Sequence, residues 1–203
     1  FAPVLGKLFF KNDPNLSNDA VQQLTRVNVP SLRCLEITNC GIQRVLLAHS
    51  ELSDVQLNTC QELRELALYS HCTKLTRLLI TDAKKLEHVG LLRQSEQAPP
   101  RIMSLADAMF NGCEALTDSL IHNFVQMCNA LMSLLVIKCN QIQRPQINSR
   151  TMRQIQFTEC INLVKPVMNC PALERLSFKV CPMLYFQDLA ELLPGSERPV
   201  IVT

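Results

Sequence analysis

The chain has 203 residues, 47% of them hydrophobic and 19% charged, which is typical of a protein that forms a buried core. Twenty Lys and Arg residues against eighteen Asp and Glu residues leave a net charge of +2, which argues against a nucleic-acid or anionic-membrane surface. The five glycines lie far apart, which excludes both a dinucleotide-binding fingerprint and a P-loop.

No segment is predicted to cross a membrane. The longest uncharged run, residues 119–137, contains several Ser, Asn, Gln and His side chains, so we expect a buried segment of a soluble domain. The front of the chain has no basic stretch followed by an apolar one, and it begins with Phe1. We expect the sequence to be part of a longer parent chain.

One phrase recurs along the chain: apolar-x-x-apolar-x-apolar-x-x-Cys. In chain order its copies begin at Leu5, Leu32, Leu52, Leu75, Leu105, Leu131, Met152 and Leu173. Six copies end in a cysteine, and these residues are called the cysteine ladder: Cys40, Cys60, Cys113, Cys139, Cys160 and Cys181. Such a period indicates an array of stacked units, with residues 1–203 forming a single domain.

The spacing inside the phrase predicts a short strand. The second and third apolar residues are two positions apart, so both point to the same side and can enter a core shared with the next unit. No unit can bury its apolar face alone, whereas stacked units share one continuous core. The sequence therefore predicts a curved α/β solenoid of about eight units, with parallel strands on its concave face.

The return arms are predicted to differ between units. In the fifth unit Thr117 and Asp118 can cap a helix whose apolar residues recur at helical spacing up to Cys128. The first unit has a similar helix start at Ser17, and residues 187–193 form a helix in the last unit. Units of 20 to 23 residues have too little chain for a full helix, so we expect extended or one-turn returns there.

Two further segments complete the predicted domain. Residues 93–101 (RQSEQAPPR) are polar and contain a Pro pair, which predicts an exposed loop and not a domain linker. Residues 185–203 form the expected C-terminal cap and tail.

These repeats resemble the leucine-rich repeats of F-box proteins. The segment Cys113-Glu114-Ala115-Leu116-Thr117-Asp118 with Leu120, and the Cys128–Leu131 stretch after the helix, are similar to the 26-residue cysteine-containing repeat of that family. The shorter units, such as 31–40 and 172–181, resemble those of plant and algal F-box proteins. The resemblance implies that a parent chain with an F-box would join a Skp-type adaptor and a cullin and present a substrate on the concave face.

The cysteines are interpreted as structural. Cys72, Cys128 and Cys170 each lie three residues before the next unit, so nine of the ten cysteines occupy two columns of buried positions. We expect free thiols and a reducing compartment, cytoplasmic or nuclear. Cys34 is the exception, because it is predicted to face outward. It is either a reactive thiol or, more simply, an exposed cysteine without a role.

A partner-binding patch is predicted on the concave face. Strand positions that face away from the core are mostly polar, but the middle units carry an apolar group with charges nearby: Leu79, Met109, Leu135 and Ile137, with Arg77 and Asp107. An apolar patch with a polar rim is typical of a surface that binds a protein. The alternative is that the chain's own loop 93–101 or its tail at 199–202 covers the patch.

Catalytic, metal and cofactor sites are not expected. The four histidines form no metal-binding spacing, C-x-x-C and G-x-S-x-G are absent from the sequence, and the adjacent His71 and Cys72 would point to opposite sides. Three functions remain: the substrate receptor of an F-box ubiquitin ligase, a structural or assembly subunit of a large complex, and a secreted recognition protein. The last has weak support from one glycosylation sequon at Asn15.

Overall fold

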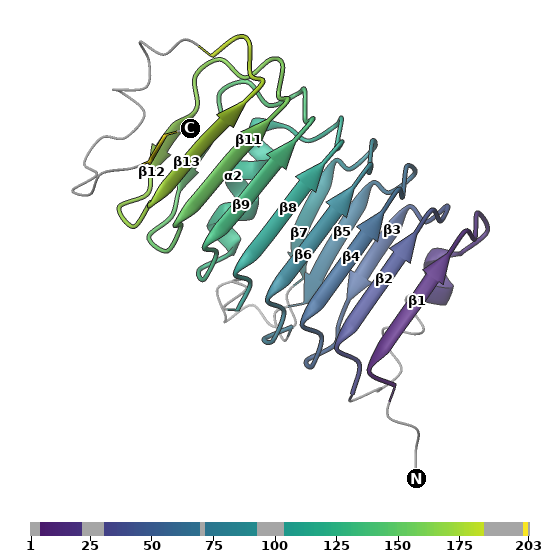
Figure 1. Ribbon diagram of the computed structural model, residues 1–203. Coiled ribbons are helices and arrows are strands. Elements are labelled where there is room, and N and C mark those ends of the chain that lie inside the picture. Colours follow the sequence, from purple (N-terminus) through teal and green to yellow (C-terminus); the bar gives the residue numbers. More distant parts are fainter. Residues whose placement is uncertain (1–4, 22–30, 70–71, 93–103, 185–200, 203) are drawn as a thin grey trace.

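The computed structural model describes residues 5–21, 31–69, 72–92, 104–184 and 201–202. Within them, one parallel sheet runs along the whole molecule with its strands side by side (Figure 1). Its strands, in spatial order, are β1 (Lys7–Lys11), β2 (Cys34–Thr38), β4 (Asp54–Asn58), β6 (Arg77–Thr81), β8 (Asp107–Asn111), β9 (Ser133–Ile137), β11 (Gln154–Thr158), β13 (Arg175–Lys179) and β14 (Ile201–Val202).

The return arms form the opposite side of the solenoid (Figure 1). Two smaller parallel sheets lie there, one of β3 (Arg44–Leu47), β5 (Glu65–Tyr69) and β7 (His88–Leu92), the other of β10 (Gln146–Asn148) and β12 (Val167–Asn169). Between them lies the helix α2 (Asp118–Met127), which contacts both β7 and β10. The units with little chain therefore return as strands, as their length predicted.

The predicted strand positions and the observed ones coincide. Each phrase is followed two residues after its first apolar residue by a five-residue strand of the large sheet, from β1 to β13. Side chains alternate along these strands, and β4, for example, buries Val55 and Leu57 completely. The predicted parallel solenoid is confirmed, and its architecture is consistent with leucine-rich repeats.

A single apolar core fills the space between the large sheet and the return arms. The buried leucines, isoleucines and valines of successive units stack in columns, as a shared core requires. Phenylalanine joins the two layers in the fifth unit, where Phe110 of β8 meets Phe124 of α2 edge to face with 5.2 Å between ring centroids. Phe157 and Phe178 stack at 5.9 Å between β11 and β13. The core is thus continuous along the stack.

A column of left-handed residues ends the strands. In the large sheet, the residue after each of the eight strands from β1 to β13 has φ between 52° and 65°; these residues are Asn12, Asn39, Thr59, Asp82, Gly112, Lys138, Glu159 and Val180. In the first seven the backbone N–H donates to the carbonyl of the last residue of the next strand at 2.7–3.0 Å. This conformation turns the chain out of the sheet while the inter-unit ladder continues, although only Gly adopts it without strain.

The helix in the fifth unit is capped as its sequence predicted. Thr117 Oγ1 accepts the backbone N–H of Leu120 at 3.3 Å, which satisfies one of the free amides at the helix start. In the first unit Ser17 Oγ accepts the N–H of Ala20 at 3.1 Å, and residues 18–21 are helical. The predicted loop 93–101 and the predicted helix at 187–193 lie outside the described residues. Among the helices described, none is long and apolar enough to span a membrane.

Candidate protein-binding surface

The predicted patch residues lie on the face of the large sheet that points away from the core, called here the open face. Register aligns Leu79 of β6 with Met109 of β8, and Met109 with Leu135 of β9, so these three side chains form one row across three adjacent strands. Ile137, at the end of β9, lies opposite Asn111. These four residues, Leu79, Met109, Leu135 and Ile137, are called the apolar strip.

The apolar strip differs from the core positions beside it. Its four side chains are partly exposed, whereas Leu78, Ala108 and Leu134, their neighbours on the same strands, are buried. The row continues into Gln56 of β4 on one side and Gln156 of β11 on the other. The row of Leu79, Met109 and Leu135 is therefore an apolar stretch with a polar side chain at each end.

Charges beside the strip are only partly neutralised. Arg77 lies between Asp54 and Asp107 in the sheet register, and its guanidinium pairs with Asp54, with 3.8 Å between Nη1 and Oδ2. Asp107 is exposed and forms no ion pair with any residue of the described ranges. A carboxylate next to the apolar strip is consequently open to a partner.

In units two to four, the side chains of the last strand residues form hydrogen bonds with one another. Asn58 Nδ2 donates to Thr38 Oγ1 at 3.4 Å, and Thr81 Oγ1 donates to Asn58 Oδ1 at 3.2 Å. Because these groups bond to one another, this part of the open face offers fewer groups to a partner than the apolar strip does.

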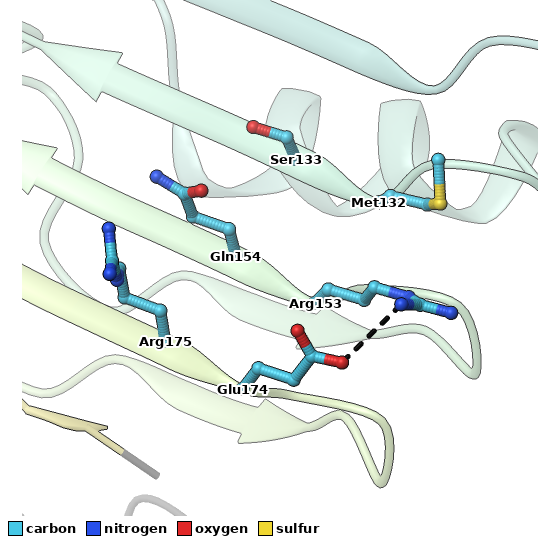
Figure 2. A pocket seen from close by; sticks show the side chains of 6 residues that line it. All are labelled: Met132, Ser133, Arg153, Gln154, Glu174 and Arg175. Carbon is cyan, nitrogen blue, oxygen red and sulfur yellow. Dashed lines mark hydrogen bonds and ion pairs between the residues drawn. The ribbon is translucent and has the colours of Figure 1, made fainter.

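A shallow hollow of about 580 Å³ adjoins the strip at the beginning of β9, β11 and β13. Figure 2 shows its side chains: Ser133, Gln154 and Arg175 follow one another across the three strands, with Met132, Arg153 and Glu174 at the rim. Arg153 pairs with Glu174 at 3.4 Å. The exposed Arg175 makes no ion pair with any described residue, so the hollow presents a free guanidinium.

Two residues of the tail, Ile201 and Val202, lie at the edge of the large sheet. They form β14, which pairs with β13. This edge is separated from β9 by β11 and β13. These two residues are therefore not above the apolar strip, and the other possible cover, loop 93–101, lies outside the described residues.

The cysteine ladder lies at the turns that follow the strands of the large sheet, at the edge of the apolar core. Cys40, Cys60, Cys113, Cys139 and Cys160 are buried and Cys181 is partly buried; all six are free thiols. From Cys60 onwards each thiol lies within hydrogen-bonding distance of a strand carbonyl of the preceding unit, for example Cys60 Sγ at 3.5 Å from the Ile37 oxygen. The thiols thus serve as small side chains that satisfy neighbouring carbonyls.

Burial keeps two of these thiols, Cys60 and Cys160, protonated. It raises the pKa of Cys60 to about 11 and that of Cys160 to about 12, because a thiolate would lose its hydration. A hydrogen bond with Cys113, together with burial, raises the pKa of Cys139. In the second cysteine column burial raises the pKa of Cys128 to about 12. Thiols with raised pKa values are poor nucleophiles and poor metal ligands.

Cys34 has no activating environment. Its side chain is partly exposed on the open face, and its pKa is raised, first by partial burial and then by the nearby Asp54. The described residues contain no group of three or more His, Cys, Asp or Glu side chains placed to hold a metal ion. His71 of the His71-Cys72 pair lies outside the described residues, and Cys72 is buried.

Sequence reasoning missed the left-handed column and the pairing of the charges. Four of the eight left-handed positions carry Asn, Asp or Gly, which favour that conformation. Thr59 and Val180 occupy two of the others, and β-branched residues do not indicate a left-handed conformation. The sequence placed Arg77 and Asp107 near the strip, but only the side-chain geometry shows that Arg77 pairs with Asp54 and leaves Asp107 unpaired.

Comparison with known proteins agrees with this architecture. Residues 112–186 match the family model described as FBD-associated F-box protein At5g56370, LRR repeats. No curated protein matches the chain at a significant level. The matched stretch runs from the turn after β8 past β13, and thus includes α2 and the hollow. Over this stretch the chain is similar to the leucine-rich repeats of F-box proteins.

Proposed function

We propose that this chain is the substrate-recognition repeat region of an F-box-type ubiquitin ligase subunit. The fold is that of a protein-interaction repeat module, and the single observation that carries the proposal is the partly exposed apolar strip beside an unpaired Asp107 on the open face. The likeness of residues 112–186 to the repeats of an F-box protein supports the ligase context.

In this proposal the F-box and the open face have separate roles. An F-box elsewhere in the parent chain would bind a Skp-type adaptor and, through it, a cullin, while the open face holds the substrate. In this proposal the module acts by binding a partner protein. Ten free cysteines fit a reducing compartment, the cytoplasm or the nucleus.

A second candidate function has its own support. Apolar side chains are also exposed away from the open face, among them Ile161 (47% exposed) and Val180 (72% exposed), which line a hollow beyond the strand ends. Several apolar surfaces on one solenoid are expected of a structural subunit that is enclosed in a large assembly. This candidate predicts a fixed set of partners on more than one face.

Affinity purification of the full-length parent from native lysate, with identification of the bound proteins by mass spectrometry, tests the ligase proposal. Recovery of a Skp-type adaptor and a cullin in amounts comparable to the parent is the expected result. Recovery of a constant multi-protein assembly without either of them would contradict it and support the structural subunit.

A further inference from the structure

The row Leu79, Met109 and Leu135 runs across the strands and not along one of them, and this direction restricts what can lie on it. Adjacent strands are about 4.8 Å apart, so the three side chains repeat at that interval. A helix laid across the strands presents one side chain per turn about every 5.4 Å. An extended segment in the same direction presents same-side residues only every 6.6 to 6.8 Å or so.

The mismatch accumulates along the row. Over the two intervals from β6 to β9 a helix departs from the row by about 1.2 Å and an extended segment by about 4 Å. Side chains at positions i, i+3 or i+4, and i+7 of a helix would therefore meet the three strip residues in succession. The apolar strip fits a helix better than it fits a strand.

Unpaired charges of opposite sign lie in the neighbouring row. Asp107 of β8 and Arg175 of β13 occupy the same register row, with Ser133 and Gln154 between them (Figure 2). Both charged side chains are exposed, and neither forms an ion pair within the described ranges. Three strand intervals separate them, about 14 Å, and residues eleven positions apart on one side of a helix are about 16.5 Å apart, a difference that long charged side chains can span.

We propose that the open face binds an amphipathic helix of a partner protein, laid across the strands, with its apolar side chains on Leu79, Met109 and Leu135, a basic side chain at Asp107 and an acidic one at Arg175. This inference rests on the proposed function, since it specifies the substrate segment that the same surface takes. Charge complementarity fixes the order of the two charges along the helix. The shallow hollow between Met132 and Arg175 leaves room for the helix end that carries the acid.

A displayed library of random 20-residue peptides, selected on the purified chain, tests the proposal with a defined probe. Enriched sequences should show apolar residues at i, i+3 or i+4 and i+7, with Lys or Arg and Asp or Glu about eleven positions apart on one side of the helix. Enriched sequences with alternating apolar residues, or with Pro inside the apolar pattern, would overturn the helix. Failure to enrich any sequence would overturn the binding surface.

Charge reversal provides the control, because Asp107 and Arg175 are exposed and their replacement does not disturb the core. Asp107→Lys should weaken a selected peptide about tenfold, and a peptide with its basic residue changed to Glu should recover that loss. Arg175→Glu should behave in the same way toward the acidic residue. Independence of the peptide affinity from both reversals would contradict the assigned contacts.

A second form of the chain distinguishes a partner from self-occupation. If residues 94–100 are replaced by a short Gly-Ser linker, selection should enrich the same peptides with unchanged affinity. Enrichment only in the shortened form would show that the chain's own loop occupies the strip. Because no adaptor or cullin is present in the selection, its outcome is independent of whether the parent belongs to a ligase.

Discussion

The carboxylate of Asp118 accepts the backbone N–H of Arg144 at 2.9 Å, and thereby joins the start of one unit's helix to the return arm of the next. Its second oxygen accepts the N–H of Gln143 at 2.9 Å. Where the arms are extended, a backbone carbonyl has this role; the oxygen of Gln43, for example, accepts the amides of Arg64 and Glu65. This explains the Thr-Asp pair in the repeat. Thr117 caps the helix, and the Asp118 carboxylate accepts the two amides that a backbone carbonyl accepts where the arm is extended.

Removal of this carboxylate should destabilise the solenoid. Asp118→Ala leaves two backbone amides without their acceptors, and the free energy of unfolding should fall by about 2 kcal/mol. Asp118→Asn should cost much less, because Asn18 in the first unit accepts the amides of Gln43 and Arg44 with one amide oxygen. Urea unfolding of the two variants measures the difference. Equal loss in both, or no loss in the alanine variant, would contradict this role.

Glycine should be favourable in the left-handed column and unfavourable one residue earlier. Thr59 is β-branched with φ 53°, so Thr59→Gly should relieve about 1 kcal/mol of strain and keep or raise the melting temperature. Thr81→Gly, at the end of β6, removes the hydrogen bond to Asn58 and loosens a strand, and it should lower the melting temperature. A larger loss at Thr59 than at Thr81 would refute the strain argument.

The converse substitution tests the same column. Gly112 has φ +65°, and a Cβ there would lie 2.5 Å from Asp82 Oδ1 in the neighbouring unit. Gly112→Ala should therefore lower the free energy of unfolding by about 1 to 2 kcal/mol. Gly90→Ala is the matched control, because a Cβ at Gly90 meets nothing within 4 Å. The prediction is wrong if both variants unfold at the same urea concentration.

Stability should fall at alkaline pH. Burial raises the pKa of Cys60, Cys72 and Cys170 to about 11 and that of Cys128 and Cys160 to about 12 in the folded chain, above the ordinary thiol value of 9.0 that applies to the unfolded chain. Between pH 9 and the folded pKa values the unfolded chain binds fewer protons than the native one. The stabilisation present below pH 9 is therefore lost as pH rises, by up to about 1.4 kcal/mol per pH unit for each thiol.

One buried thiol can be removed to measure its share of this effect. Cys128→Ala should reduce the slope of the unfolding free energy between pH 9 and 11 relative to the wild type, even though it creates a small cavity that lowers stability at every pH. Urea unfolding at pH 8, 9, 10 and 11 provides the slopes. Identical slopes in the two proteins would show that the ionisation of Cys128 is not coupled to folding.

Thiol labelling should distinguish the two exposed positions from the buried ones. Cys34 and Cys181 are partly exposed with raised pKa values, so in the native protein at pH 8 they should react slowly, and the other eight cysteines should not react. In guanidinium all ten should react. Mass spectrometry after iodoacetamide treatment locates the label. Rapid labelling of Cys139 or Cys160 would contradict their burial.

The strands could be predicted because core packing imposes a fixed period, so that Val55 and Leu57, for example, follow Leu52 at set distances. The open-face row was also predictable, because register between stacked strands follows from the repeat itself. The role of Asp118 toward Arg144 was not, because it joins side chain and backbone across 26 residues, and no local pattern encodes that contact. Likewise, the strand formed by Ile201 and Val202 has no repeat phrase that could have predicted it.

The central claim is that the apolar strip captures a partner protein, and paired variants of the full-length parent test it most directly. The double variant Met109→Glu with Leu135→Glu changes the open face, while Ile161→Glu places one such charge on an exposed side chain elsewhere. Quantitative mass spectrometry of the co-purified proteins, after circular dichroism has shown that both variants fold, compares them with the wild type. The account predicts that a specific partner is lost from the double variant and retained by Ile161→Glu. Retention of every partner by the folded double variant would contradict it.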